Sequence, residues 1–122
     1  RKLLNFGHTI GHAIESLSQD TDNPLSHGEA ISIGMIAEGR LSELLELLPH
    51  QEYSELEQSI TKAGLPTTYE LTADKVLGKI KSDKKNEDGQ TNWTLLQGIG
   101  KAVYNQKVDD SLVRKVLWMF LN

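Results

Sequence analysis

The spacing of apolar and polar residues predicts a helix over residues 2–18. At about 100° per residue, the apolar residues fall on one broad side and the polar residues on the other. The apolar side carries Leu3, Phe6, Ile10, Ala13, Ile14 and Leu17. The polar side carries Arg1, Asn5, His8, His12 and Glu15 within an arc of roughly 80°. We therefore expect the polar stripe to face solvent or a site while the opposite side packs on a core.

A second helix is predicted from residue 27 to about residue 48. Ser26 and Glu29 have the S-x-x-E spacing of a capping box, which places His27 in the first turn. The run AISIGMIA is apolar on most sides, so this helix is expected at the centre of the domain. Pro49 is expected to end it.

The rest of the chain predicts three shorter helices and one hairpin. The helices are expected over residues 51–63, over residues 73–81 and after a cap at Asp109 or Asp110. The charged run KSDKKNEDGQ reads as a loop, and TNWTLLQ and KAVYNQKV as two strands joined at Gly98-Ile99-Gly100. The prediction is one mainly α, multi-helical domain over residues 1–122 with a small β-hairpin.

Composition and net charge argue against several classes of function. The net charge of −4 argues against a nucleic-acid partner, because phosphate backbones attract basic surfaces. Without cysteine the chain has no disulfides and no thiolate metal ligands, which fits a cytoplasmic protein. No run of about 20 apolar residues predicts a membrane helix, and no signal peptide is visible. The chain begins at Arg1, and its chemically active residues crowd the first thirty positions, as expected of a piece of a longer protein, although a processed N-terminus would look the same.

Histidines carry the candidate chemistry. His8 and His12 lie at i, i+4, so both rings project from one helix face. This spacing suits a shared divalent metal, or one ligand beside one acid–base group, although an exposed pair would look the same. Gly7 and Gly11 each cost about 1 kcal/mol in a helix, and they leave room for a ligand or another backbone.

A third histidine adds to this candidate metal site. At a helix N-terminus the dipole disfavours imidazolium, so His27 is expected in the neutral form that binds zinc. A catalytic zinc site takes three protein ligands. Glu29 is expected to be occupied by its cap and Glu15 is not clearly placed as a ligand, so the sequence offers part of a site.

Lysines supply a second candidate contact. Lys81, Lys84 and Lys85 surround Asp83 in the charged run, where they are either solvated or available to a phosphate or carboxylate. His50, after Pro49, is expected in a surface loop.

These motifs resemble a known family. LNFGHTIGHAIE followed by HGEAISIGM resembles the C-terminal domain of 3-dehydroquinate synthase, and SDKKNEDGQTNWTLLQGIG resembles its lysine loop and hairpin. The resemblance implies a phosphate-eliminating carbon–oxygen lyase of the shikimate pathway, which serves aromatic amino acid biosynthesis. Such an enzyme converts 3-deoxy-D-arabino-heptulosonate 7-phosphate, a phosphorylated sugar acid, to 3-dehydroquinate and phosphate. It uses NAD for a transient oxidation and a divalent metal, normally zinc and alternatively cobalt.

The resemblance also implies roles for single residues. His8 and His27 correspond to metal ligands, and His12 to a catalytic histidine near the substrate phosphate. Arg1 and Asn5 correspond to substrate contacts, Arg1 for the carboxylate. Lys84 corresponds to the lysine that contacts the phosphate, with Lys85 as the other possible register.

Parts of the family's enzyme do not appear in this sequence. No G-x-G-x-x-G follows a predicted strand, and the resemblance implies that the NAD-binding domain and a third, glutamate metal ligand precede Arg1. We therefore expect this chain alone to be inactive, and the parent enzyme to be a homodimer.

Two other functions remain open at this point. A different sugar-phosphate cyclase, such as 2-deoxy-scyllo-inosose synthase, shares the GHT/GH and HGE patterns, although Arg1 and Asn5 favour dehydroquinate synthase. A freestanding, non-catalytic helical module could also use two or three histidines to hold zinc.

Overall fold

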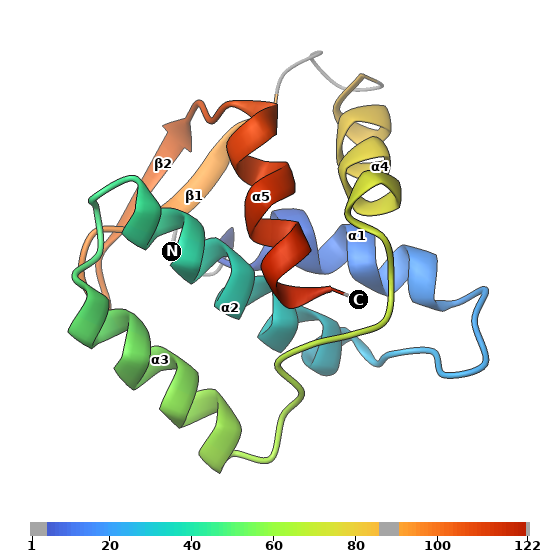
Figure 1. Ribbon diagram of the computed structural model, residues 1–122, viewed down its shortest axis with the longest axis horizontal. Helices are drawn as coiled ribbons and strands as arrows, with labels where there is room; N and C mark the ends of the chain where they lie inside the picture. The colour runs from blue at the N-terminus through green and yellow to red at the C-terminus, as the bar shows by residue number, and fades with distance from the viewer. Residues whose placement is uncertain (1–4, 86–90, 122) are drawn as a thin grey trace.

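The computed structural model describes residues 5–85 and 91–121. In chain order the elements are α1 (His8–Ser18), α2 (His27–Leu44), α3 (His50–Lys62), α4 (Ala73–Lys85), β1 (Trp93–Leu96), β2 (Ala102–Gln106) and α5 (Asp110–Phe120). The predicted class, mainly α with one small hairpin, is confirmed (Figure 1).

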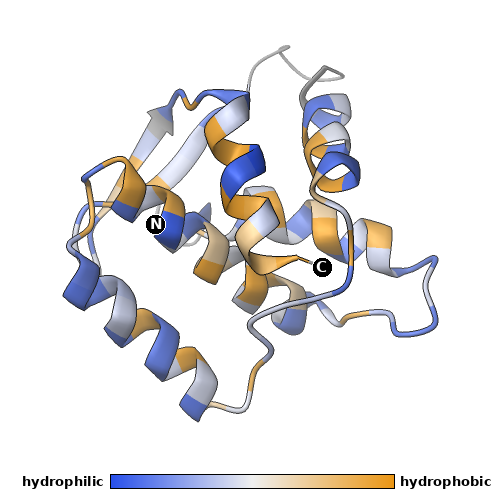
Figure 2. Cartoon of the chain, in the orientation of Figure 1, coloured by the Kyte–Doolittle hydropathy of each residue, from blue (hydrophilic) through white to orange (hydrophobic). Residues whose placement is uncertain are grey.

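Helix α2 is the centre of the fold, as its apolar run predicts. It packs against α1, α3, α5 and β1, and α5 lies across it in Figure 1. Its residues Ile33, Ile36 and Leu41 are fully buried. In Figure 2 the hydrophobic stretches of α2 and α5 lie toward the middle of the molecule. Burial of these apolar side chains supplies the main stabilisation of the fold.

The hairpin forms where the sequence predicts it. Strands β1 and β2 are antiparallel, with Leu95 opposite Val103 and Leu96 opposite Ala102. The turn between them uses Gly98 and Gly100, both at positive φ. All four residues of β1 are buried, so this strand closes one side of the core.

Helices α1 and α2 approach so closely that their backbones touch. A Cβ at Gly34 would overlap the Gly7 carbonyl oxygen and lie 2.7 Å from the Gly11 nitrogen. A Cβ at Gly7 would lie 2.5 Å from Met35 Cγ. The room left by Gly7 and Gly11 is therefore filled by the backbone and side chains of α2, which is one of the two uses that the sequence left open.

The structure corrects several predicted helix boundaries. Within the described residues the first helix begins at His8, because Gly7 is left-handed at φ 87° and ends any right-handed helix there. The second ends at Leu44: Leu47 donates to the Ser42 carbonyl and Glu46 has φ 63°, so the chain turns before Pro49.

Two further corrections concern charged and polar segments. Helix α4 continues to Lys85, so residues 82–85 are helical rather than part of a loop, and Lys79 pairs with Asp83 one turn later at 3.4 Å. His50 is exposed as predicted, but it is the first residue of α3 rather than a loop residue.

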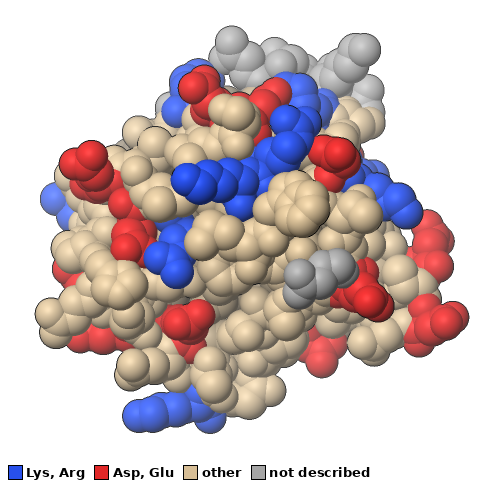
Figure 3. Space-filling model, viewed as in Figure 1, with Lys and Arg blue, Asp and Glu red and all other residues tan. Residues whose placement is uncertain are grey.

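The surface mixes charges of both signs. In Figure 3, Lys and Arg side chains gather in the upper part of the face in view, and Asp and Glu side chains border them. Among the exposed ion pairs of the described residues, Lys81 pairs with Asp110 at 2.7 Å and Arg114 with Asp74 at 2.8 Å. Among the described residues, no helix has the length and apolar character needed to cross a membrane.

Candidate metal and substrate site

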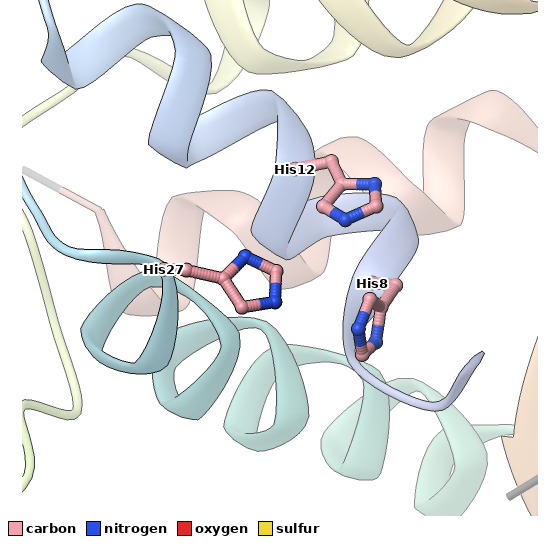
Figure 4. A group of neighbouring side chains, drawn as sticks. All are labelled: His8, His12 and His27. Carbon is pink, nitrogen blue, oxygen red and sulfur yellow. The ribbon is translucent and has the colours of Figure 1, made fainter. Parts of the chain in front are cut away.

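Three histidine rings meet where α1 passes the start of α2. His8 and His12 come from α1 and His27 from the first position of α2, and Figure 4 shows the three rings grouped together. The ring centroids are 4.9 Å apart for His8 and His12, 5.5 Å for His8 and His27, and 5.7 Å for His12 and His27. One nitrogen from each ring lies within 4.8 Å of the other two. These spacings let two or three of the rings share one metal ion.

The capping box fixes His27 at this place. The Ser26 hydroxyl accepts from the Glu29 N–H at 3.2 Å, and the Glu29 carboxylate accepts from the Ser26 N–H at 2.9 Å. Glu29 is therefore engaged by the cap, as predicted.

Two of the rings have a partner on Nδ1. The Nδ1–H of His27 donates to the Glu15 carboxylate at 2.9 Å, and the Nδ1–H of His8 donates to the Phe6 carbonyl at 3.3 Å. Because a carbonyl or carboxylate oxygen is the acceptor, Nδ1 is the nitrogen that carries the proton when the ring is neutral. The Nε2 of each ring then keeps its lone pair, as a metal ligand requires.

His12 differs from the other two in its electrostatics. Burial lowers the pKa of His12, and the neighbouring His8 and His27 rings lower it further. A neutral imidazole is therefore favoured at neutral pH, and it can accept a proton or a metal.

A cleft of about 310 Å³ opens beside His8 and His12. Its walls come from the start of α1, the end of α4 and the region of strand β1, so α1, α4 and the hairpin together form it. The lining residues are Asn5, His8, Thr9, His12, Ile80, Asp83, Asn92 and Thr94. The structure thus brings together three predicted site residues, Asn5, His8 and His12, on one wall.

Two predicted substrate contacts cannot be placed. Arg1 lies outside the described residues. Lys84 lies in the last turn of α4, the helix whose Ile80 and Asp83 line the cleft, but its side chain is also outside the described part. Both remain predictions.

Sequence reasoning missed several residues at this site. Glu15 belongs to the predicted polar stripe, but its role beside the histidines was not predicted. Its position three residues after His12 is the sequence signal that it lies close to them. Asp83, Asn92 and Thr94 carried no such signal, because only the packing of α4 and β1 against α1 brings them to the cleft.

The donor set fits a divalent metal such as zinc or cobalt. Imidazole is a common ligand for both metals, and the carboxylate behind His27 is the kind of outer partner that metal-bound histidines usually have.

Comparisons with known proteins identify the family of this chain. A family model described as 3-dehydroquinate synthase C-terminal matches residues 1–86. The 3-dehydroquinate synthase of Xylella fastidiosa strain 9a5c is 42% identical over 122 residues, covering 96% of this chain and 31% of that protein. The 3-dehydroquinate synthase of Latilactobacillus sakei is 47% identical over 107 residues, covering 87% of this chain and 28% of that protein.

Solved structures give the same fold. The 2-epi-5-epi-valiolone synthase ValA of Streptomyces hygroscopicus, with NAD⁺ and Zn²⁺ bound, superposes with a TM-score of 0.83 at 26% identity over 96% of this chain and 32% of its own. A 2-deoxy-scyllo-inosose synthase complexed with carbaglucose-6-phosphate, NAD⁺ and Co²⁺ superposes with a TM-score of 0.76 at 29% identity. The match covers 98% of this chain and 34% of that protein. The chain thus spans about a third of the length of these proteins. With its histidine cluster, its helical fold and these matches, the chain belongs to the 3-dehydroquinate synthase C-terminal family.

Proposed function

We propose that this chain is the metal- and substrate-binding part of a 3-dehydroquinate synthase. The parent enzyme would convert 3-deoxy-D-arabino-heptulosonate 7-phosphate to 3-dehydroquinate and phosphate, as a carbon–oxygen lyase of the shikimate pathway. The observation that carries the proposal is the histidine cluster at the edge of a cleft, in a chain 42% identical to a 3-dehydroquinate synthase.

His8 and His27 are the proposed metal ligands. Both rings are held through Nδ1, which leaves Nε2 as the donor, and both helices are locked together by glycine contacts. The remaining ligands would come from a further protein group and from substrate. The metal would supply Lewis-acid polarisation of a substrate oxygen.

His12 and Asn5 are the proposed substrate residues of the described part. His12 lines the cleft, and its lowered pKa keeps the ring neutral, so it can take a proton at the phosphate-bearing end of the substrate. The Asn5 side chain offers an amide donor and acceptor to substrate hydroxyls. Arg1 and Lys84 are proposed to bind the substrate carboxylate and phosphate.

NAD is proposed to bind to a part of the enzyme outside these 122 residues. The chain covers 32% of the ValA structure, which holds NAD⁺, and 31% of the Xylella synthase. The 122 residues by themselves are therefore proposed to be a metal- and substrate-binding domain without activity of its own.

A second candidate is a self-contained zinc module. It is favoured by one observation, the convergence of all three histidine rings, which would supply three of the four ligands of a structural zinc site. In that case His12 would be a ligand instead of a substrate residue.

A hybrid enzyme tests the proposed function. This chain would replace the matching segment of the Xylella fastidiosa synthase, and phosphate release would be measured with NAD and zinc. The expected result is that the hybrid releases phosphate from 3-deoxy-D-arabino-heptulosonate 7-phosphate, and that His12→Ala in the same hybrid abolishes this release.

A hybrid that binds zinc and NAD but releases phosphate only from a hexose 6-phosphate would favour the inosose synthase alternative. A hybrid that binds both and releases phosphate from neither substrate would overturn the proposal.

A further inference from the structure

Glu38 is a buried acid in the middle of α2. Its side chain is fully buried, within the helix that forms the centre of the core. One carboxyl oxygen accepts from the Gly7 N–H and the other from the Ile10 N–H, both at 2.8 Å. A buried carboxyl group is costly, and an apolar side chain of similar size often replaces such a group without loss of stability. Its presence therefore calls for a reason beyond packing.

The two N–H groups belong to the end of a helix that has no cap of its own. The first N–H groups of an α-helix have no acceptor within the helix and are normally satisfied by an N-cap side chain. The N-cap of α1 is Gly7, which has no side chain, and the first bond within the helix runs from the Gly11 N–H to the Gly7 carbonyl at 2.9 Å. Glu38 thus caps α1 from a different helix.

The capped turn carries a proposed metal ligand. The two N–H groups held by Glu38 lie one residue before His8 and two residues after it. The ring of His8 is also held by the Phe6 carbonyl, directly before this turn. The backbone on both sides of His8 is therefore tied to α2, the helix that begins with His27.

We propose that Glu38 is a positioning residue that sets the place of the His8 ring relative to His27, by holding the first turn of α1 through Gly7 and Ile10. The inference rests on the proposed function only in taking His8 as a metal ligand. Glu38 acts through the backbone and touches neither metal nor substrate.

Glu38→Gln tests the proposal while keeping the volume of the side chain. The amide nitrogen would then place a donor against one of the two N–H donors. The matched control is Ser42→Ala, one turn later in α2. It removes a buried hydroxyl that donates to the Glu38 backbone carbonyl at 2.8 Å and accepts from the Leu96 N–H at 3.0 Å, so both of these partners lie outside α1 and the Glu38 carboxyl group is left in place. This control lowers stability without releasing the turn that carries His8.

Two measurements report on the position of the His8 ring: its ring spectrum and the zinc affinity of the chain. Ring ¹H–¹⁵N spectra without metal should show altered His8 signals in Glu38→Gln, while the signals of exposed His50 on α3 stay unchanged. Zinc affinity should fall by at least about tenfold, the range seen when an outer partner of a metal ligand is lost. Ser42→Ala should change neither readout.

Several results would overturn the inference. A folded Glu38→Gln variant whose His8 ring signals are unchanged would overturn it. A Ser42→Ala variant whose His8 ring signals change as much as those of Glu38→Gln would also overturn it. If Glu38→Gln does not fold, amide exchange in the unmodified chain decides: protected Gly7 and Ile10 amides support the proposal, and fast-exchanging ones contradict it. If the unmodified chain binds zinc too weakly to titrate, as a site that lacks its third protein ligand allows, the ring spectra alone decide the role of Glu38.

Discussion

At the scale of single residues, the three histidines are distinguished by what holds each ring. His27 is tied to a carboxylate and His8 to a backbone carbonyl, whereas burial and its two histidine neighbours lower the pKa of His12. The first two rings have the support that metal ligands need, and the third keeps the neutral form that a proton acceptor needs. The geometry therefore supports a division of roles within one cluster.

The Glu15 carboxylate is expected to strengthen metal binding through His27. Glu15→Gln removes the negative charge that stabilises the Nδ1–H, so zinc affinity should fall by about tenfold in calorimetric titration. Glu43→Gln is the matched control, because Glu43 accepts from the Nδ1 of His50 at 2.7 Å outside the site. Equal loss of affinity in both variants would contradict a specific role for Glu15.

Much of the residue-level site could be predicted from helical spacing. The polar stripe placed Asn5, His8 and His12 together, and the capping box placed His27 at a helix start, as the structure has them. Glu38 could not be found this way, since it lies in an apolar run and its partners are backbone groups of another helix. Contacts of that kind leave no spacing signal in a sequence.

At the scale of elements, the contact of α1 with α2 holds the histidines together. The two helices meet through Gly7, Gly11 and Gly34, where no side chain separates the backbones. Because His8 and His12 lie on one helix and His27 on the other, the spacing of the cluster depends on this contact.

Adding one methyl group to this contact should separate the helices. A Cβ at Gly34 overlaps the backbone of Gly7, so Gly34→Ala should lower the free energy of unfolding by about 3 kcal/mol, the upper part of the range for overpacking. Gly28→Ala in the same helix meets no atom within 4 Å and should be neutral or slightly stabilising. Urea denaturation of both variants makes the comparison, and similar stabilities for the two would contradict the close packing.

Glu38 should make the stability of the fold depend on pH. Burial raises the pKa of Glu38 to about 8, against the opposing effect of the N–H groups of Ile10, Gly7 and Thr9. The folded state thus binds this proton more tightly than the unfolded state, whose ordinary value is 4.5. The contribution of Glu38 to stability is therefore full below pH 4.5 and falls as the pH rises toward 8.

Urea denaturation at a series of pH values checks this dependence. Between pH 5 and pH 8 the unmodified chain should lose more free energy of unfolding than Glu38→Gln, by roughly 1.4 kcal/mol for each unit of pKa shift that is titrated. If the free energies of unfolding of the two proteins depend on pH in the same way, the raised pKa of Glu38 is contradicted.

The elements themselves were more predictable than their ends. Apolar spacing and turn residues predict the five helices and the hairpin found in the described residues, because each of these elements buries apolar side chains. The ends of α1, α2 and α4 were misplaced, because left-handed Gly7, the turn at Glu46 and the Lys79–Asp83 pair depend on local geometry that spacing does not encode.

At the scale of the whole molecule, the proposed function makes the chain one part of a larger active site. It has the histidine cluster and one side of a cleft, and it covers about a third of its relatives. Under the proposed function, the cleft formed by α1, α4 and β1 would be completed by a second surface that carries NAD.

The 122 residues alone are therefore expected to be inactive. With zinc, NAD and 3-deoxy-D-arabino-heptulosonate 7-phosphate, the isolated chain should release phosphate no faster than a blank without protein. NAD-dependent phosphate release by the isolated chain, in a colorimetric phosphate assay, would show that hydride transfer needs no further domain.

Cobalt titration of the chain and its three histidine variants tests the central claim most directly. His8→Ala and His27→Ala should each remove most of the affinity, while His12→Ala should bind with nearly unchanged affinity and visible spectrum, because His12 serves the substrate. Equal loss in all three variants would make the cluster a three-histidine metal site and contradict the division of roles proposed for this chain.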